Sequence, residues 1–445
     1  MSDRPPPLLD GLADRILSTG KIAAAGARLA SRRAFGFEGE RDAKLGAALA
    51  TELDRMKGMA MKVGQIFSYF DGILPDQAQE ALRGLQQGAT RLPYGRVARV
   101  IEEELGRPIE AVFEDFERDP AASASIGQVH RARYKGRAVA VKIQYPGLAD
   151  SIEADFARLR PFTRLISVGT AVDGPRIADD LVARLVEECD YRTEAASQEA
   201  FRAAFAADPE IAIPAVVPEA TSRRVLTMAW AEGRDLYRFA TEAPQGHRDA
   251  ATRTLVRFVY RSLFELETVN ADPHPGNYLF PRGCPTAAPI VFLDFGCTHA
   301  FTPEFMASER AIARCVIDGH RDRFDEVFLA TGMVASPRGF DYDVQWRMHR
   351  LQYRPFWDRE FVYTTDFMRE AMEMSGPSNP NLRRLAISNE WVWLQRLVWG
   401  LHAVLVRFGA RAPLGDVLRE QLDRPRAPLV RGDGSSQVTP QSATP

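Results

Sequence analysis

The sequence predicts an α+β fold, rich in helix, in which a short run of strands lies between two long helical regions. Three observations predict this class. Apolar residues recur every three or four positions from about 41 to 70, as one face of a helix requires. Residues 129–134 and 138–144 read as two strands joined by a hairpin turn at Lys135-Gly136. From about 248 to 412 the pattern is again largely helical, interrupted between 270 and 295.

These patterns divide the chain into five expected parts. They are a flexible N-terminal arm (1–40), a helical extension (41–110), a strand-bearing lobe with a helical insertion (111–232), a helical lobe (233–422) and a disordered tail (423–445). Within them we expect a helix at 94–106, which Gly106 ends, and a strand at 224–230 followed by a turn at Glu232-Gly233. The tail is expected to be disordered because it is rich in Pro, Ser, Gly and Thr.

Composition argues against several classes of protein. The charges of the 57 basic and 59 acidic side chains nearly cancel, so the sequence lacks the excess of basic residues that is typical of nucleic-acid-binding proteins. Four scattered cysteines without a C-x-x-C pair indicate neither a disulfide framework nor a cysteine zinc site. No apolar run reaches the ~18 residues of a membrane span, and no signal peptide is evident. We expect a cytoplasmic protein, with peripheral association at the inner membrane as an alternative; the sequence does not indicate its oligomeric state.

The small-residue loop 120–128 has the spacing of a phosphate-binding clamp. The kinase pattern G-x-G-x-x-G-x-V, followed by a strand lysine, is matched by ASASIGQV and by VAVK, which ends at Lys142. Two of the three glycines are alanines, which stiffens the loop. The alternative is an ordinary hairpin. The expected nucleotide-binding residues are Ala122, Ser123, Ala124, Ser125, Gly127, Val129 and Lys142.

Two later motifs supply the groups for phosphoryl transfer. Asp272-Pro-His-Pro-Gly-Asn277 has the D-x-x-x-x-N spacing of a catalytic loop, in which the aspartate accepts a hydroxyl proton and the asparagine ligates a metal. VFLDFG then ends an apolar strand at Asp294, a carboxylate suited to Mg²⁺. Each motif alone is weak, since Asp-Pro is ordinary turn chemistry, but their order is specific.

A strand lysine of this kind needs a glutamate partner, and the helical segment 185–197 offers Glu194. The alternative for these acids is a solvated helix face. The sequence argues against a peptide substrate because no long activation segment leads to an A-P-E motif. The nearest similar sequence, Thr302-Pro-Glu304, follows Gly296 too closely to form a peptide-docking platform. Asn270-Ala271 also replaces the His-Arg that normally precedes the catalytic aspartate.

The chain resembles the UbiB-like atypical kinases, whose mitochondrial relatives support coenzyme Q biosynthesis. The resemblance covers about residues 45–410 and rests on MKVGQ, AASASIGQVHRA, EECDYRTEA, DPHPGN and LDFG. It implies a protein-kinase-like bilobal fold with the N-terminal extension laid across the cleft. It also implies that Lys62 and Gln65 project into the pocket, facing Glu188 and Asp190 as a regulatory, cleft-covering set, and that Glu194 pairs with Lys142.

The chain departs from the family pattern in three places. Ser123 stands where alanine-only loops occur, and Gln198 stands where asparagine is expected. The bacterial namesake carries spanning helices, whereas the apolar segment 391–408 is interrupted by Gln395, Arg396 and His402. We expect this segment to be a packed helix, with peripheral membrane contact as the alternative.

The leading hypothesis is an ATP-binding (or ADP-binding), Mg²⁺-dependent atypical kinase or ATPase in ubiquinone or related isoprenoid lipid metabolism. Lys142 would hold the α- and β-phosphates, Glu194 would orient Lys142, and Asp272 would be the base. Its partners would be the nucleotide, a quinone or isoprenoid lipid and biosynthetic enzymes. One alternative is a nucleotide-gated module that binds a lipid or partner protein without phosphoryl transfer. Another is a small-molecule phosphotransferase, in which Lys62 and Glu188 have no place.

Overall fold

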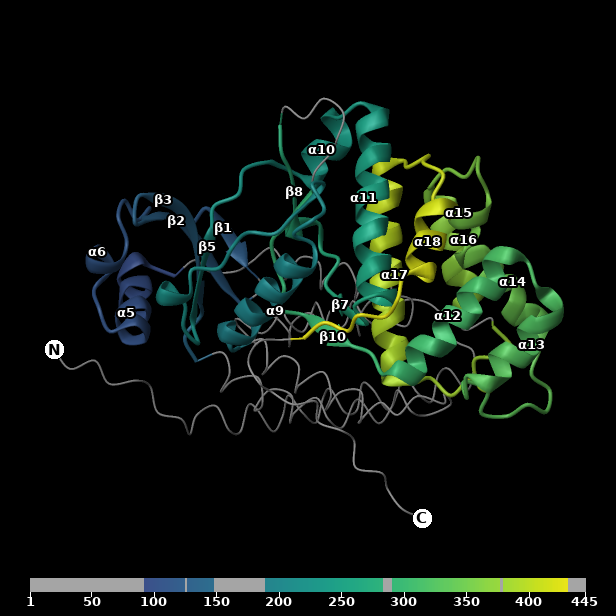
Figure 1. Ribbon diagram of the computed structural model, residues 1–445. Helices are drawn as coiled ribbons and strands as arrows, with labels where there is room; N and C mark the ends of the chain where they lie inside the picture. The colour runs from purple at the N-terminus through teal and green to yellow at the C-terminus, as the bar shows by residue number, and fades with distance from the viewer. Residues whose placement is uncertain (1–91, 125, 148–188, 283–289, 377–378, 431–445) are drawn as a thin grey trace, which may run out of the picture.

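The computed structural model describes residues 92–124, 126–147, 189–282, 290–376 and 379–430. In Figure 1 a small lobe built on a sheet stands beside a larger helical lobe, as the α+β, kinase-like expectation requires. The expected N-terminal arm, the helix at 41–70 and most of the helical insertion lie outside the described residues.

The small lobe is a four-stranded antiparallel sheet of order β1-β2-β3-β5. Its strands are β1 (Ala122–Ala124), β2 (Gly127–Tyr134), β3 (Arg137–Gln144) and β5 (Val225–Ala229), and its helices are α5 (Tyr94–Leu105) and α6 (Ile109–Val112). The predicted strands are confirmed, and Lys135 and Gly136 have φ of 49° and 75°, as a tight hairpin turn requires. The helix at 94–106 is also confirmed, with Gly106 as its left-handed cap.

Part of the predicted loop 120–128 is strand. Residues 122–124 form β1 and pair with β2, with Ala122 opposite Val129 and Ala124 opposite Gly127. Alanine and serine give little strand signal of their own, so it is the pairing with β2 that makes this segment extended.

A hydrophobic cluster on one face fixes the orientation of this sheet. Val139, Val141 and Ile143 on one face of β3 pack with Val97 and Ile101 of α5. Because side chains alternate along a strand, Ala140 and Lys142 lie on the opposite face, toward the large lobe. The sheet therefore buries one face under α5 and presents the other to the cleft.

Helix α9 (Tyr191–Ala204) stands between the lobes and begins at Asp190. The Asp190 carboxylate accepts the Arg192 N–H at 3.0 Å and pairs with the Arg192 guanidinium at 2.5 Å. Gln198 is fully buried, and its amide donates to Pro214 O at 2.6 Å. The departure from asparagine at 198 therefore has a packing role.

The large lobe contains two small sheets and most of the helices. One sheet has the order β4-β9-β8-β6, and the other pairs β7 with β10. The strands are β4 (Ile211–Ala212), β6 (Arg234–Asp235), β7 (Thr268–Asn270), β8 (Tyr278–Phe280), β9 (Ile290–Phe292) and β10 (Thr298–Ala300), and this lobe also contains the 3₁₀ turn η2 (Pro275–Asn277). The other 3₁₀ turn, η1 (Pro218–Ala220), packs against β5 of the small lobe. The helices are α10 (Leu236–Glu242), α11 (Gln245–Phe264), α12 (Pro303–Asp318), α13 (Arg321–Ala330), α14 (Tyr342–Gln352), α15 (Arg354–Trp357), α16 (Thr365–Ser375), α17 (Asn389–Phe408) and α18 (Gly415–Asp423).

The expected turn at Glu232-Gly233 is an irregular connection that leads into β6. A Cβ added at Gly233 would lie 2.9 Å from the backbone nitrogen of Phe280. The glycine is therefore needed for close approach to β8 and not for a reversal of the chain.

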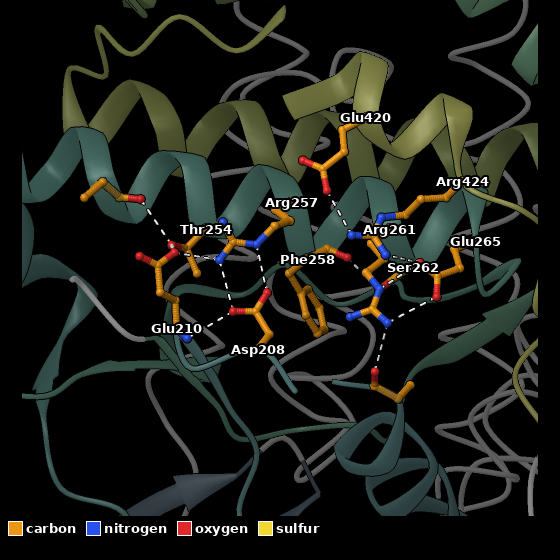
Figure 2. Close-up of polar contacts among 12 residues, drawn as sticks. Asp208, Glu210, Thr254, Arg257, Phe258, Arg261, Ser262, Glu265, Glu420 and Arg424 are labelled. Atoms are coloured by element: carbon orange, nitrogen blue, oxygen red, sulfur yellow. Dashed lines mark hydrogen bonds and ion pairs between the residues drawn. The ribbon is translucent and has the colours of Figure 1, made fainter. Parts of the chain in front are cut away.

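Arginines on α11 bind the end of α9 and the segment that follows it, and one of them shares Glu265 with Arg424 of the C-terminal segment (Figure 2). Arg257 pairs with Asp208 at 2.8 Å and with Glu210 at 2.6 Å. Arg261 pairs with Glu265 at 2.8 Å and donates to Ala204 O, at the end of α9, at 3.0 Å. Helix α9 is thereby anchored at its C-terminal end.

The prediction of disorder from residue 423 is wrong for residues 424–430. Ala427 and Leu429 donate their N–H groups to Glu265 O at 2.8 Å and Leu266 O at 2.9 Å. Arg424 pairs with Glu265 and Arg426 with Glu267. These ion pairs and backbone bonds hold the segment on the large lobe despite its composition. Residues 431–445 lie outside the described part of the chain.

The apolar segment 391–408 forms most of α17 and packs in the main core, as expected. In Figure 1 it runs beside α11 through the middle of the large lobe. Among the described residues, no helix is both long and apolar enough to cross a membrane.

Candidate active site

The sheet register aligns the expected nucleotide-binding residues. Ala122 is paired with Val129, Val129 with Lys142, and Lys142 with Leu226, so these four residues form one row across the sheet. Directly paired residues share a face, and this is the face that α5 does not cover. Ser123 and Ala124 lie on β1 next to this row, and Ser125 is outside the described residues.

Gly127 is the loop position that cannot become alanine. A Cβ there would lie 2.1 Å from Ile143 O and 2.9 Å from the Tyr191 hydroxyl. The strand end and α9 therefore meet around a residue without a side chain. This close approach gives a physical reason why glycine stands here while the other two glycine positions of the kinase pattern hold alanine.

Lys142 lies between two carboxylates. Its Nζ is 2.8 Å from Glu194 Oε1 and 2.9 Å from Asp294 Oδ2, so the predicted contact with Glu194 is present. Lys142 is 5% exposed and Glu194 3% exposed. Burial alone would lower the pKa of Lys142, but the charges of Asp294 and Glu194 outweigh it and hold that pKa well above its ordinary value. The ammonium is thus charged, and it binds two carboxylates at once.

Asp294 is held at the end of β9 by its own neighbours. Its Oδ1 accepts the Gly296 N–H at 2.9 Å, while Oδ2 faces Lys142. The next residue, Phe295, is fully buried with its ring centre 5.1 Å from that of Phe201 on α9. The carboxylate therefore projects from a backbone that both lobes hold in place.

The catalytic-loop carboxylate, Asp272, is bound from two directions. Asn277 Nδ2 donates to Asp272 Oδ2 at 3.1 Å and to Asp272 O at 3.0 Å. The guanidinium of Arg396, on α17, donates to Asp272 Oδ1 at 3.0 Å. Burial lowers the pKa of Arg396 to about 9, which still leaves it charged at neutral pH.

Asn270 and Arg396 are site residues that the sequence reasoning missed. Asn270 donates its amide to Asp294 O and accepts the Asp272 N–H at 3.2 Å, so it joins the two predicted motifs. In the sequence, Asn270 could have been identified by its position two residues before Asp272, where the kinase catalytic loop normally has a histidine. In the sequence Arg396 stands out only as a charged residue that interrupts an apolar segment. A charged residue on a buried helix needs a partner, and this need is the feature that points to it.

The donor set suits a divalent cation that arrives with phosphates. Asp294 offers carboxylate oxygens, and Asn277 has its amide oxygen left for a ligand because its nitrogen binds Asp272. Within the described residues, no group of three or more His, Cys, Asp or Glu side chains could hold a metal by itself. Mg²⁺ is usually bound through one or two carboxylates plus substrate phosphates and waters, so the residues present fit it.

The expected regulatory set is only partly described. Asp190 lies at the start of α9, one turn before Glu194, and pairs with Arg192. Lys62, Gln65 and Glu188 lie outside the described residues, so their cleft-covering role stays a prediction.

Comparisons with known proteins agree with this geometry. The model of the ABC1 atypical kinase-like domain matches residues 84–327, a range that contains Lys142, Glu194, Asp272 and Asp294 but not Arg396. A solved structure, the Rv3197–erythromycin complex from Mycobacterium tuberculosis, superposes with a TM-score of 0.63 at 28% identity, covering 86% of this chain and 97% of that one. The kinase-like fold is therefore confirmed.

Two curated relatives are similar over much of this range. The mitochondrial atypical kinase COQ8B of Rattus norvegicus is 35% identical over 271 residues, covering 60% of this chain and 51% of the relative. The mitochondrial atypical kinase COQ8 of Saccharomyces cerevisiae is 30% identical over 270 residues, covering 59% and 52%. The chain spans about half the length of these curated relatives. The resemblance to UbiB-like atypical kinases is thus confirmed, and since the domain model matches more than half of its residues, this chain belongs to the ABC1 atypical kinase-like family.

Proposed function

We propose that this protein binds ATP with Mg²⁺ and transfers the γ-phosphoryl group, as an atypical kinase or ATPase in ubiquinone or related isoprenoid lipid metabolism. The observation that carries the proposal is the position of Lys142, whose Nζ lies within 2.9 Å of both Glu194 and Asp294. A buried ammonium beside a carboxylate at the end of a strand is the arrangement that holds nucleotide phosphates and their metal in kinases.

The small lobe would bind the nucleotide. Ala122, Ser123, Ala124, Ser125, Gly127 and Val129 would cover the phosphates through their backbone. Lys142 would keep its contact with Glu194 and contact the α- and β-phosphates. The face of the sheet next to Lys142 carries Ala140, which is paired with Met228 and gives an apolar surface for the base.

The large lobe would carry out the chemistry. Asn277 and Asp294 would hold Mg²⁺, which would supply positive charge against the charge that develops on the transferred group. Asp272 would accept the proton of the attacking hydroxyl as its oxygen bonds to the γ-phosphorus. The bond between that phosphorus and the bridging oxygen breaks, and ADP leaves with the electron pair. When the attacking group is water, the same step is ATP hydrolysis.

The segment after Asp294 favours a small acceptor over a peptide. Thr298–Ala300 forms β10 and pairs with β7, and α12 begins at Pro303. Thr302-Pro-Glu304 is therefore the start of a helix, and the chain between Gly296 and Pro303 has no room for a peptide-docking platform. This supports a small-molecule or lipid acceptor, and the COQ8 names of the relatives support a link to quinone metabolism.

The test is ATP turnover with and without Mg²⁺, alone and with quinone-like phenols or vesicles of phosphatidylcholine and phosphatidylglycerol. We expect Mg²⁺-dependent release of ADP by the wild type and a loss of about 10²- to 10³-fold in Asp272→Asn. The matched control is Asp322→Asn, which removes an exposed carboxylate on α13.

Other outcomes would favour a different function for this protein. ATP binding without turnover under every condition would favour the nucleotide-gated binding module. A phosphorylated small molecule formed in equal amount with ADP would favour the small-molecule phosphotransferase. Full turnover by Asp272→Asn would contradict the assignment of the base.

A further inference from the structure

We infer that Arg396, on α17, is a positioning residue for the catalytic-loop carboxylate. The inference rests on the proposed function, because it assigns Arg396 a role in the reaction at Asp272. The two residues are 124 positions apart in the sequence, and the guanidinium nitrogen lies 3.0 Å from Asp272 Oδ1.

The loop has no space for an arginine of its own. Ala271, directly before Asp272, is 0% exposed and donates its N–H to Cys297 O at 2.8 Å. A long charged side chain at this position would have to enter the core. The cation that contacts the loop therefore comes from another element.

Helix α17 lies unusually close to the loop, and a glycine makes this possible. A Cβ added at Gly400 would lie 1.8 Å from Pro273 Cγ and 2.7 Å from Pro273 Cβ. Gly400 follows Arg396 by four residues, so both lie on the same side of α17. The loop is thus seated on α17 by a backbone contact at Pro273 and by a charged hydrogen bond at Asp272.

The Arg396 side chain is itself held in place. It is 15% exposed, and its guanidinium carbon lies 5.7 Å from the ring centre of Trp393, one turn earlier on α17. Trp393 is 8% exposed, and α17 packs in the main core. An arginine that is already ordered loses little freedom when it binds a carboxylate, so it can fix that carboxylate's orientation.

Together, Arg396 and Asn277 determine how Asp272 points. Arg396 donates to Oδ1 and Asn277 donates to Oδ2, so each of these donors directs one oxygen of the carboxylate. Without Arg396 the carboxylate would lose the donor that directs Oδ1. Small displacements of a reacting group are costly for rate and cost little in substrate binding.

The test compares Arg396→Met with Arg407→Met, a control that removes an exposed arginine from the last turn of the same helix. We expect kcat for ATP to fall by about 10- to 100-fold in Arg396→Met, with KM for ATP and stabilisation by Mg-ATP unchanged. Arg396→Lys should recover part of kcat, and added guanidinium ion should raise the turnover of Arg396→Ala. Arg407→Met should match the wild type.

Three results would overturn the inference. An unchanged or increased kcat in Arg396→Met would show that Arg396 does not position the carboxylate. A loss that neither lysine nor guanidinium restores, together with weaker Mg-ATP stabilisation, would show a purely structural role. Absence of turnover in the wild type would instead overturn the proposed function, and the inference with it.

Discussion

The two sides of the active site pair their charged groups differently. On the side nearer the small lobe, the Lys142 ammonium faces two carboxylates, Glu194 of α9 at 2.8 Å and Asp294, which follows β9 of the large lobe, at 2.9 Å. On the large-lobe side, the Asp272 carboxylate faces the guanidinium of Arg396 at 3.0 Å. The first cluster brings two carboxylates to one ammonium beside an expected metal ligand, whereas in the second a guanidinium meets the expected base. We therefore expect changes in the first cluster to alter the response to nucleotide and metal, and changes in the second to alter the rate.

The largest effect is expected when a substitution breaks the cluster around Lys142. Lys142→Met would remove the ammonium that lies 2.8 Å from Glu194, a carboxylate that is only 3% exposed. Removing one partner of a buried ion pair typically costs about 3–5 kcal/mol, and we expect a loss of this size in the free energy of unfolding. Urea denaturation measures it. Lys135→Met, which removes the exposed lysine of the hairpin turn, is the control, and equal stability of the two variants would contradict the cluster's role.

The second prediction sharpens the metal assignment. Asp294→Asn keeps the shape of the side chain and removes its negative charge, so the site loses one carboxylate ligand. We expect ATP turnover to fall by about 10²- to 10³-fold and its dependence on Mg²⁺ concentration to shift to higher values. Turnover that keeps the wild-type rate and the wild-type Mg²⁺ dependence would show that Asp294 is not a metal ligand.

The third prediction concerns the contact between α17 and the catalytic loop. Gly400→Ala places a methyl group 1.8 Å from Pro273 Cγ, so α17 and the loop must separate. Overpacking typically costs about 1–3 kcal/mol, partly offset by alanine's better helix propensity of about 1 kcal/mol. We expect a net loss of about 1 kcal/mol and a lower kcat. Gly246→Ala, where nothing lies within 4 Å, should be neutral or stabilising.

The smallest expected effect is the pH dependence of stability, which comes from two buried histidines outside both clusters. Burial lowers the pKa of His349 and of His402 to about 4, from an ordinary value of 6.5. Between pH 6.5 and 4 the unfolded chain therefore binds protons that the folded chain does not, so stability falls as the pH falls through this window. From pH 7.5 to 6 each histidine should cost about 0.8 kcal/mol. Urea titrations of His402→Leu at both pH values should show a smaller loss than the wild type.

The sequence predicted the small-lobe side of the site better than the large-lobe side. Lys142, Glu194 and Asp294 each stand in a local pattern of strand or helix, so their meeting follows from the kinase arrangement of those elements. Arg396 contacts Asp272 only because α17 packs against the loop at Gly400, which no local pattern of residues indicates. Asn270 was visible as a departure from histidine, but its bonds to both motifs depend on the β7–β10 pairing. The order of residues 424–430 likewise depends on distant acids, Glu265 and Glu267.

The central claim is most directly tested by thermal unfolding of the wild type, Lys142→Met and Asp294→Asn in the presence of ATP, with and without Mg²⁺. A ligand that binds the folded state stabilises it, by about 2.7 kcal/mol at a concentration 100 times its Kd. We predict that Mg-ATP stabilises the wild type, that Lys142→Met loses this stabilisation, and that Asp294→Asn loses the part that depends on Mg²⁺. A wild type that ATP does not stabilise, with or without Mg²⁺, would contradict the account.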